Sequence, residues 1–397
     1  MTAWTPAVQR VRRVVRERIS AALTGGVFPG AVVAIARRER TLYVEAFGHA
    51  QLLPRRRPAT THTVYDLASL TKPLVTATAI LQLWEEGRAD LDAPVASYLP
   101  PFATGGKASI TVRHLLTHTS GLPAWEMLYL PAPPDGATAL SAAARARACR
   151  SIREAISRIC ATPALAPPGV RVEYSDLGFI VLGFLVERLS GESLAQYAAR
   201  RIFGPLGMTA TRFCPPASWR LRCAATEVGN AYERAKAAEQ GAGRQFAWRT
   251  ALLRGEVHDG NAWYVGGGVA GHAGLFGTAA DLACFGRLML QGGTLDGVRV
   301  FSAPTVQEAT RHQTRGVGGE PRGLGWALKG CPFVGTRPSA RAFGHTGFTG
   351  TSLLVDPERD LAVVLLSNRV HPRADTEAIR QFRPAFHDAV IEAWDGR

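Results

Sequence analysis

The chain has 397 residues, of which 46% are hydrophobic and 20% are charged, and its net charge is +14. These proportions are typical of a soluble globular protein that buries a large core. No segment approaches the apolar length that a membrane span needs. The positive charge comes from scattered arginines that are not interleaved with aromatic residues. This distribution argues against nucleic-acid binding and leaves attraction of an anionic substrate as the alternative.

The six cysteines show no Cys-x-x-Cys spacing and no clustering with histidine of the kind that binds zinc. We therefore expect buried thiols in a reducing compartment and no metal site, with a Cys214–Cys223 disulfide as the alternative.

The first 20 residues contain several arginines but lack the apolar core of a signal peptide. This predicts a cytoplasmic protein, or a periplasmic or secreted one if a leader has been removed.

The N-terminal third predicts a helix, a hairpin and a second helix. Apolar residues recur at helical spacing over Val8 to Leu23. Two strand-like runs follow, Gly30 to Ala36 and Thr41 to Phe47, and the charged turn Arg37 to Arg40 joins them. The next helix extends from Ser69 up to Gly87, where glycine favours its end.

The middle of the chain, up to about residue 280, indicates mainly helices and long loops. Helices are predicted at Ile110 to Leu116, Arg147 to Cys160 and Leu177 to Leu189. Residues 219–265 have a mixed, irregular pattern, and we expect them to wall a binding cleft, as long loops in compact domains often do.

The C-terminal third returns to sheet, with strands predicted at Gly323 to Leu328, Thr351 to Val355 and Leu361 to Ser367, and ends in an amphipathic helix over 374–394. The sequence thus predicts an α+β fold in which both ends of the chain build one antiparallel sheet, flanked by the N- and C-terminal helices. Residues 1–68 and 281–397 would form this sheet subdomain. Residues 69–280 would form an inserted, mainly helical subdomain, with the active site between the two.

Ser69-Leu70-Thr71-Lys72 is the most informative stretch of the chain. Residues three apart on a helix lie on one face, so the Lys72 amine can reach the Ser69 hydroxyl and take its proton. The chain has only four lysines, which makes a chance Ser-x-x-Lys match rare. This pair predicts a serine nucleophile.

Two later segments can complete such a site. Tyr174-Ser175-Asp176 follows a Pro/Gly loop and precedes the predicted helix at Leu177, which would expose a phenol at a helix start. His345-Thr346-Gly347 lies in glycine-rich strand material, where a substrate backbone can approach closely. Asp176 has a second interpretation as the N-cap of the following helix.

In order and spacing, the three motifs resemble the penicillin-recognising serine hydrolases, a superfamily that carries S-x-x-K, a second motif and K-T-G. Nearly the whole chain resembles the class C β-lactamase-like branch, which includes serine esterases and D-alanyl-D-alanine peptidases. The stretches 110–122, 255–259 and 271–276 are also similar to that branch. The resemblance implies the β-lactamase/transpeptidase-like fold.

The resemblance also implies an acyl-enzyme mechanism without a cofactor. Ser69 would attack a carbonyl while Lys72 and Tyr174 move the proton, and water would then release the acyl group. The backbone amides of Ser69 and Phe348 would form the oxyanion hole. Asp176 and the third motif, His345-Thr346-Gly347, would contact substrate. To act as a base, the lysine needs its pKa lowered by burial or by a nearby cation.

Two departures from the family pattern shape the expected activity. Asp176 stands where an asparagine is usual, and an ionised carboxylate can only accept hydrogen bonds. His345 replaces the lysine of the third motif and removes a permanent cation. Both changes argue against efficient β-lactam hydrolysis. The leading hypothesis is therefore a carboxylesterase for small esters.

Other functions remain as alternatives. His345-Thr346-Gly347 is similar to the motif of certain D-peptidases, so a D-alanyl-D-alanine carboxypeptidase or class C-like β-lactamase is the second hypothesis, and a non-catalytic binding protein is the third. The expected partner is a small ester, amide or β-lactam, and the oligomeric state is left open.

His114 and His118 have the spacing of a helical metal pair but no glutamate between them, so a structural role is predicted. His258-Asp259 and His272 are expected to fix loop geometry.

Overall fold

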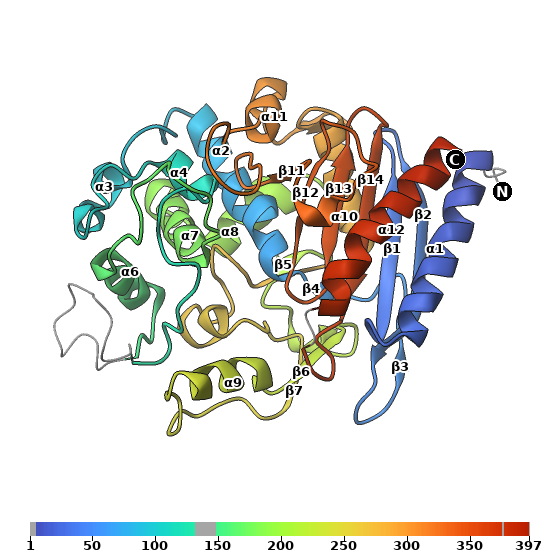
Figure 1. Ribbon diagram of the computed structural model, residues 1–397, viewed down its shortest axis with the longest axis horizontal. Helices are drawn as coiled ribbons and strands as arrows, with labels where there is room; N and C mark the ends of the chain where they lie inside the picture. Colours follow the sequence, from blue (N-terminus) through green and yellow to red (C-terminus); the bar gives the residue numbers. More distant parts are fainter. Residues whose placement is uncertain (1–4, 132–147, 375–376, 397) are drawn as a thin grey trace.

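The computed structural model describes residues 5–131, 148–374 and 377–396. Its centre is a seven-stranded antiparallel sheet with the strand order β11-β12-β13-β14-β1-β2-β3 (Figure 1). The strands are β1 (Gly30–Ala36), β2 (Thr41–Gln51), β3 (Arg57–Pro58), β11 (Ala327–Leu328), β12 (Phe343–Thr346), β13 (Ser352–Asp356) and β14 (Leu361–Ser367). Both ends of the chain therefore build one sheet, as predicted.

The two ends meet at β1, where Ala31 lies opposite Phe47 of β2 and Ser367 of β14. Every residue of β1 and of β14 is buried. A strand that is covered on both faces is largely apolar, which explains why these strands appear in the sequence as nearly continuous apolar runs.

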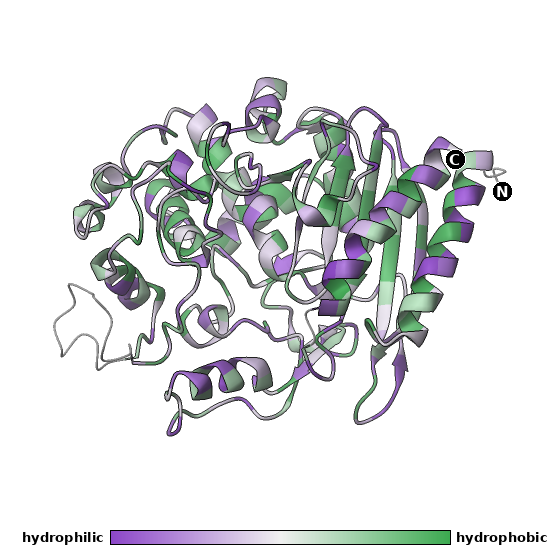
Figure 2. Ribbon diagram, viewed as in Figure 1, coloured by the Kyte–Doolittle hydropathy of each residue, from purple (hydrophilic) through white to green (hydrophobic). Residues whose placement is uncertain are grey.

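Helices cover both faces of the sheet. Alternate residues of β1 (Ala31, Val33 and Ile35) belong to the apolar cluster that α1 (Pro6–Thr24) and α12 (Glu377–Asp395) bury, and the residues between them belong to the larger cluster on the opposite face. α1 and α12 lie side by side on the outer face, and α10 (Ala279–Leu290) packs on the inner one (Figure 1). Figure 2 shows the apolar strands beside α1 and α12, both of which carry hydrophilic residues. The predicted α+β fold is confirmed.

The remaining elements form a second group, outside the seven-stranded sheet and the helices that cover it. Its α-helices are α2 (Thr78–Glu85), α3 (Val95–Tyr98), α4 (Val112–Leu116), α6 (Ile152–Ala161), α7 (Asp176–Ser190), α8 (Leu194–Ala198), α9 (Ala231–Glu239) and α11 (Ala303–Thr310). Its strands are β4 (Tyr65–Asp66), β5 (Arg212–Phe213), β6 (Ala225–Val228), β7 (Leu252–Arg254), β8 (Leu275–Gly277), β9 (Thr294–Leu295) and β10 (Val298–Arg299). The subdomain boundaries at residues 68 and 281 stay a prediction.

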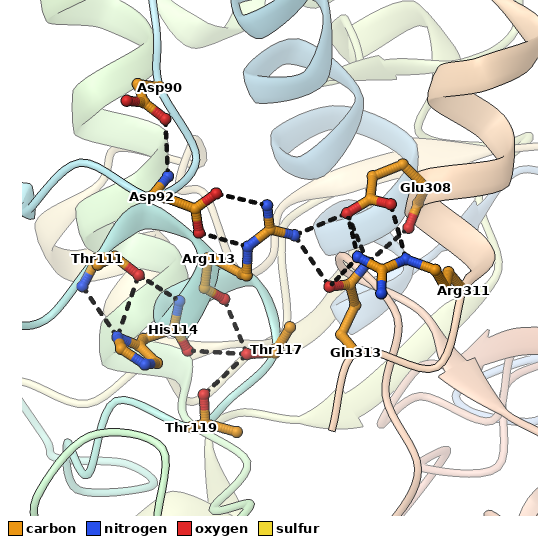
Figure 3. A network of polar contacts seen from close by, with 10 residues as sticks. All are labelled: Asp90, Asp92, Thr111, Arg113, His114, Thr117, Thr119, Glu308, Arg311 and Gln313. Atoms are coloured by element: carbon orange, nitrogen blue, oxygen red, sulfur yellow. Dashed lines mark hydrogen bonds and ion pairs between the residues drawn. The ribbon is translucent and has the colours of Figure 1, made fainter. Parts of the chain in front are cut away.

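Shorter helical turns connect these elements. They are the 3₁₀ turns Ala68–Leu70, Pro100–Ala103, Ala217–Trp219 and Pro332–Val334, and the π-helical turns Lys72–Ala77, Ala199–Phe203 and Asn261–Val265. A polar network fixes α4 against α11: Arg113 binds Asp92 at 2.7 Å and Glu308 at 2.8 Å (Figure 3). This network lies on the helical side of the molecule.

Three sequence predictions differ from the fold. The strand expected over Gly323 to Leu328 is restricted to β11, Ala327–Leu328. The helix expected from Arg147 begins only at Ile152, because the Ser151 side chain accepts a hydrogen bond from the Glu154 amide and caps it there; Arg147 itself lies outside the described residues. The segment 219–265, expected to be irregular, contains β6, α9 and β7. Charged residues around small alanines gave α9 no clear apolar periodicity.

The cysteines also differ in part from expectation. All six are free thiols, so the alternative disulfide between Cys214 and Cys223 does not form. Cys214 is exposed and Cys284 is half-buried, whereas the other four are buried as predicted.

Within the described ranges, no helix is both long enough and apolar enough to span a bilayer.

Candidate active site

Ser69 lies on a short turn between a strand and a helix. Ala68, just before it, adopts a left-handed conformation with φ of 47°, and its amide donates to Asp66 at 2.9 Å. The 3₁₀ turn Ala68–Leu70 and the π-helical turn Lys72–Ala77 then continue into α2. Ser69 therefore stands at the N-terminal end of a continuous helical stretch, where the aligned peptide dipoles favour negative charge.

Lys72 is fully buried, and its ammonium has three partners besides Tyr174. The Nζ atom donates to Ser69 Oγ at 3.0 Å and to the His272 carbonyl at 3.1 Å, and it lies 2.6 Å from Asp176 Oδ1. Burial lowers the pKa of Lys72, but the Asp176 carboxylate and Tyr174 raise it by more, so this pKa lies above its ordinary value. The expectation of a lowered lysine pKa is therefore wrong, because an anion rather than a cation lies beside the amine.

Tyr174 completes the trio around the serine. Its phenol hydrogen-bonds with both Ser69 and Lys72, and the Lys72 ammonium lies 4.8 Å from the centre of its ring. Burial raises the pKa of Tyr174 above its ordinary value, and the lysine offsets only part of that effect. A protonated phenol thus connects the serine hydroxyl with a charged lysine.

The second motif is held by the start of α7. Ser175, not Asp176, caps this helix: its hydroxyl accepts from the Gly178 amide at 3.2 Å. The N-cap interpretation of Asp176 is therefore wrong, and its carboxylate is used instead by Lys72. His118, which the sequence assigned only a structural role, accepts a hydrogen bond from the Ser175 amide at 3.0 Å and stacks on the Tyr174 ring with centroids 4.4 Å apart.

The third motif continues from β12. His345 Nδ1 contacts the Thr346 carbonyl at 2.8 Å; because a carbonyl only accepts, this nitrogen carries the proton and Nε2 presents a lone pair. Burial and the nearby Lys72 and Arg322 cations hold the pKa of His345 well below its ordinary value. The histidine is thus neutral, and the loss of positive charge expected at this position is real.

A glycine is required at position 347 for the motif to approach the serine. A Cβ atom there would lie 2.2 Å from Thr351 Oγ1 and 2.3 Å from the Leu67 carbonyl, well inside contact distance. Leu67 is two residues before Ser69. The small glycine therefore lets the third motif pack directly against the backbone that positions the nucleophile.

Two cavities meet at the serine, and Ser69, Tyr174 and Phe348 line both. The first measures about 500 Å³, and four of its lining residues are arginines (Arg322, Arg369, Arg380 and Arg383). The second measures about 300 Å³ and contains the carboxylates of Asp176, Glu233 and Asp259. The predicted oxyanion residues and the third motif, His345-Thr346-Gly347, thus surround the same space as the nucleophile.

Several residues of the site were not singled out from the sequence. Arg322 and Arg383 are buried and line the first cavity, yet no local pattern marks them. His272 and Asp259 were assigned to loop geometry, but His272 offers its carbonyl to Lys72 and its Nε2 lies 2.9 Å from Asp259 Oδ1. Glu233 belongs to α9, which the sequence did not predict.

One cluster of side chains has the spacing that a metal ion would need. Over the described parts of the chain, the one group able to hold an ion is Asp176, Asp259 and His272, whose ligand atoms lie within 4.8 Å of one another. The Lys72 ammonium already supplies a cation to Asp176. His114 and His118 do not converge: His114 Nδ1 contacts Thr111 at 3.1 Å (Figure 3), while His118 faces Ser175.

Comparisons with known proteins agree with this site. Residues 15–385 match the family described as Beta-lactamase, and the chain belongs to that family. A relative from Escherichia coli named "Putative D-alanyl-D-alanine carboxypeptidase" is 35% identical over 370 residues, which cover 88% of this chain and 81% of the relative. The family resemblance found in the sequence is confirmed, and the protein is a hydrolase of this family.

Solved structures show the same fold. A penicillin-binding protein homologue from Caulobacter crescentus has a TM-score of 0.70 at 23% identity and covers 98% of this chain and 99% of its own. A family VIII carboxylesterase has a TM-score of 0.69 at 23% identity and covers 99% of both chains. Hydrolases of this family act on esters, amides and β-lactams, which is the substrate class predicted from the sequence.

Proposed function

We propose that the protein is a serine D-alanyl-D-alanine carboxypeptidase, a hydrolase that removes the last residue from peptides with a free C-terminal carboxylate. The observation that carries this proposal is the arginine-lined cavity beside Ser69. The sequence favoured an esterase because His345 removes the cation of the third motif. The arginines supply that missing positive charge from other parts of the chain.

Burial makes three of these arginines, Arg322, Arg369 and Arg383, strong candidates for an anion site. Among the described residues, the hydrogen bonds that Arg383 donates go to two backbone carbonyls, those of Gly347 at 2.6 Å and Thr351 at 3.0 Å. Burial and then the neighbouring cations Arg369 and Arg380 lower the pKa of Arg383 to about 9. A buried group of like charges is destabilised until an anion enters, so a carboxylate would be bound strongly there.

Arg322 offers a second contact in the same cavity. One of its terminal nitrogens pairs with Glu320, whereas its Nε atom is buried and has no hydrogen-bond partner among the described residues. The guanidinium lies 5.7 Å from the centre of the Tyr174 ring, close to the expected position of the leaving group. An unpartnered buried donor of this kind favours an incoming carboxylate.

The chemistry proposed is two-step acyl transfer. As the Ser69 oxygen bonds to the peptide carbonyl carbon, its proton passes to the Tyr174 oxygen, and the phenol's own proton passes in the same step to the peptide nitrogen. The C–N bond then breaks and the amine departs with that proton. In deacylation a water oxygen bonds to the acyl carbon, its proton passes to the Tyr174 oxygen, the phenol proton returns to Ser69 Oγ as the ester C–O bond breaks, and the acid is released. Lys72 remains protonated throughout, because its pKa is raised, and its charge stabilises the serine oxygen as negative charge develops.

The test is a comparison of matched substrates. Release of the last residue is measured, as D-alanine from diacetyl-L-lysyl-D-alanyl-D-alanine and as D-alaninamide from the same peptide with a C-terminal amide. We expect the acid to be cleaved at least about tenfold faster, and Arg322→Gln to reduce that advantage by about 10- to 100-fold, since a hydrogen bond to a charged group contributes roughly 1.5–3 kcal/mol. Equal cleavage of acid and amide would contradict the proposal, and Ser69→Ala is the inactive control.

A carboxylesterase is the second candidate. The neutral His345 favours it, because an uncharged third motif does not require an anionic substrate. Hydrolysis of p-nitrophenyl butyrate, with no cleavage of either peptide, would favour this function over the first.

A further inference from the structure

Phe348 follows the third motif, and its backbone amide is the second donor of the predicted oxyanion hole. Its side chain lines both cavities, so its position depends on the groups that contact its ring and its carbonyl. An oxyanion donor must lie within hydrogen-bond distance of the charged oxygen, and the loss of one donor typically reduces kcat by about 10²–10³-fold. The contacts of Phe348 therefore bear directly on the rate.

Two basic side chains contact the Phe348 ring. The Arg369 guanidinium lies 4.3 Å from the ring centre, and its Nε atom donates to the Phe348 carbonyl at 2.6 Å. The His258 ring stacks on Phe348 with centroids 5.5 Å apart and an interplanar angle of 25°. An aromatic face attracts a cation that lies within about 6 Å of its centre, and the attraction is stronger where water is excluded. Because Arg369 and His258 are both buried, the stronger case applies here.

A buried carboxylate holds the His258 ring. The Nε2 atom of His258 lies 3.0 Å from Glu227 Oε2, and both side chains are buried. The other oxygen of Glu227 accepts from the Tyr232 amide at 2.9 Å, which fixes the carboxylate. Burial lowers the pKa of His258, but Glu227 and two further carboxylates raise it by more, so this pKa lies above its ordinary value. The imidazole that stacks on Phe348 is therefore a cation at neutral pH.

His258 is also connected to the other oxyanion donor. Its backbone amide donates to Asp66 Oδ2 at 2.7 Å, and Asp66 Oδ1 accepts from the Ala68 amide at 2.9 Å. Ala68 is the left-handed residue directly before Ser69. One buried carboxyl group thus holds both the turn that presents the Ser69 amide and the residue that stacks on Phe348.

We propose that His258 is a positioning residue: together with Arg369 it holds Phe348 where the Phe348 amide can donate to the oxyanion of the tetrahedral intermediate, and Glu227 keeps the imidazole in place and charged. This role goes beyond the loop geometry that the sequence assigned to His258. It rests on the acyl transfer at Ser69 in the proposed function, and it is independent of the choice between peptide and ester substrates.

The test uses two uncharged alkyl probes that differ in one atom: a fluorophosphonate, and the fluorophosphonothioate in which sulfur replaces the phosphoryl oxygen. In both reactions the Ser69 oxygen bonds to phosphorus as the P–F bond breaks, and the serine proton passes through Tyr174 to the fluoride. The phosphoryl atom enters the oxyanion hole, and sulfur accepts hydrogen bonds only weakly. The ratio of the two labelling rates reports on the hole, because a change in proton transfer affects both probes alike.

Two positions and one control assign the effect. His258→Gln removes the imidazole cation, and we expect it to lower the oxygen-to-sulfur labelling ratio by about 10-fold or more, which is part of the 10²–10³ that a lost donor costs. His62→Gln, the same change at an exposed histidine, should leave the ratio within about twofold of wild type. Arg369→Met should also lower the ratio, and Arg369→Lys, which keeps a cation near the ring, should lower it less.

The pH dependence of this ratio is a second measurement, and in the wild type it depends on no variant. A neutral imidazole is attracted less to Phe348, so the ratio should fall as pH rises through the raised pKa of His258. Glu227→Gln lowers that pKa and should move the fall to lower pH. Burial and then the charge of Asp259 raise the pKa of Glu233 to about 7, so Glu233 supports the imidazolium chiefly above that pH. The charged groups that face His258 and set the midpoint are Asp66, Glu227, Glu233, Arg249 and Asp259.

The outcomes are distinguishable. If neither probe labels Ser69 in the wild type, acyl transfer at this serine fails and the inference fails with it. If both probes label and His258→Gln leaves the ratio unchanged, the proposed function stands and the positioning role is refuted. A ratio that does not respond to pH in either the wild type or Glu227→Gln would also refute it, and this comparison decides the matter should His258→Gln not fold.

Discussion

Replacing Gly347 with alanine tests how closely the third motif must approach the serine. The added methyl would lie 2.2 Å from Thr351 Oγ1 and 2.3 Å from the Leu67 carbonyl, and the second contact is with backbone that cannot rotate away. Overpacking of this kind typically costs about 1–3 kcal/mol of folding free energy. Relief of the clash would move the strand away from Leu67, and a displacement of about 1 Å in an active site reduces activity by roughly 100-fold.

The assay combines denaturant unfolding with the rate at which a fluorophosphonate probe labels Ser69. Gly318→Ala is the matched control, because a methyl group at that glycine meets no atom within 4 Å and its φ is not positive. We expect the control to stay within about 0.5 kcal/mol of wild type and to label normally. If Gly347→Ala unfolds and labels as the control does, the close approach of motif and nucleophile is not needed.

Three further variants have defined outcomes. Asp176→Asn removes the anion that raises the pKa of Lys72. Because activity requires the charged lysine, the alkaline limb of the kcat/KM profile should move to lower pH. A gain of activity at high pH would instead identify a neutral lysine base. Tyr174→Phe should reduce kcat by about 10²–10⁴-fold with Ser69 still in place, and unchanged turnover would exclude the proton shuttle. The stability of Glu233→Gln relative to wild type should be greater at pH 8 than at pH 5. The pKa of Glu233 is raised from 4.5 to about 7 on folding, so wild-type stability falls as pH rises through this range, by up to about 3 kcal/mol; equal denaturation midpoints for the variant and wild type at both pH values would contradict this.

The sequence predicted the parts of the molecule that depend on local pattern. Ser69 and Lys72 are three residues apart on one helical stretch, so their contact follows from helix geometry. The strands around Ala31 and Ser367 are uninterrupted apolar runs, and burial on both faces makes such runs recognisable. Tyr174 needed the family resemblance, because a lone tyrosine before a helix has no distinctive pattern.

Other features could not be predicted because they depend on how distant segments pack. Ser175 and Asp176 are adjacent and both can cap a helix, and only the path of the chain decides that the hydroxyl caps while the carboxylate meets Lys72. Arg322 lies shortly before β11 and Glu233 lies on α9, and each lines a different one of the two cavities that meet at Ser69. Neither has a periodic neighbourhood, so no spacing in the sequence connects them with Ser69.

The pairing of β1 with β14 has a consequence for how the protein is made. At about 5–20 residues per second, a ribosome needs roughly 20–70 s to synthesise the chain between these strands. During that interval the first hairpin exposes one unpaired, wholly apolar edge, which is a site where nascent chains can associate. Whether the nascent chain aggregates then depends on how this edge is shielded before the last hairpin emerges. If the ribosome stalls before residue 361, the edge of β1 stays unpaired.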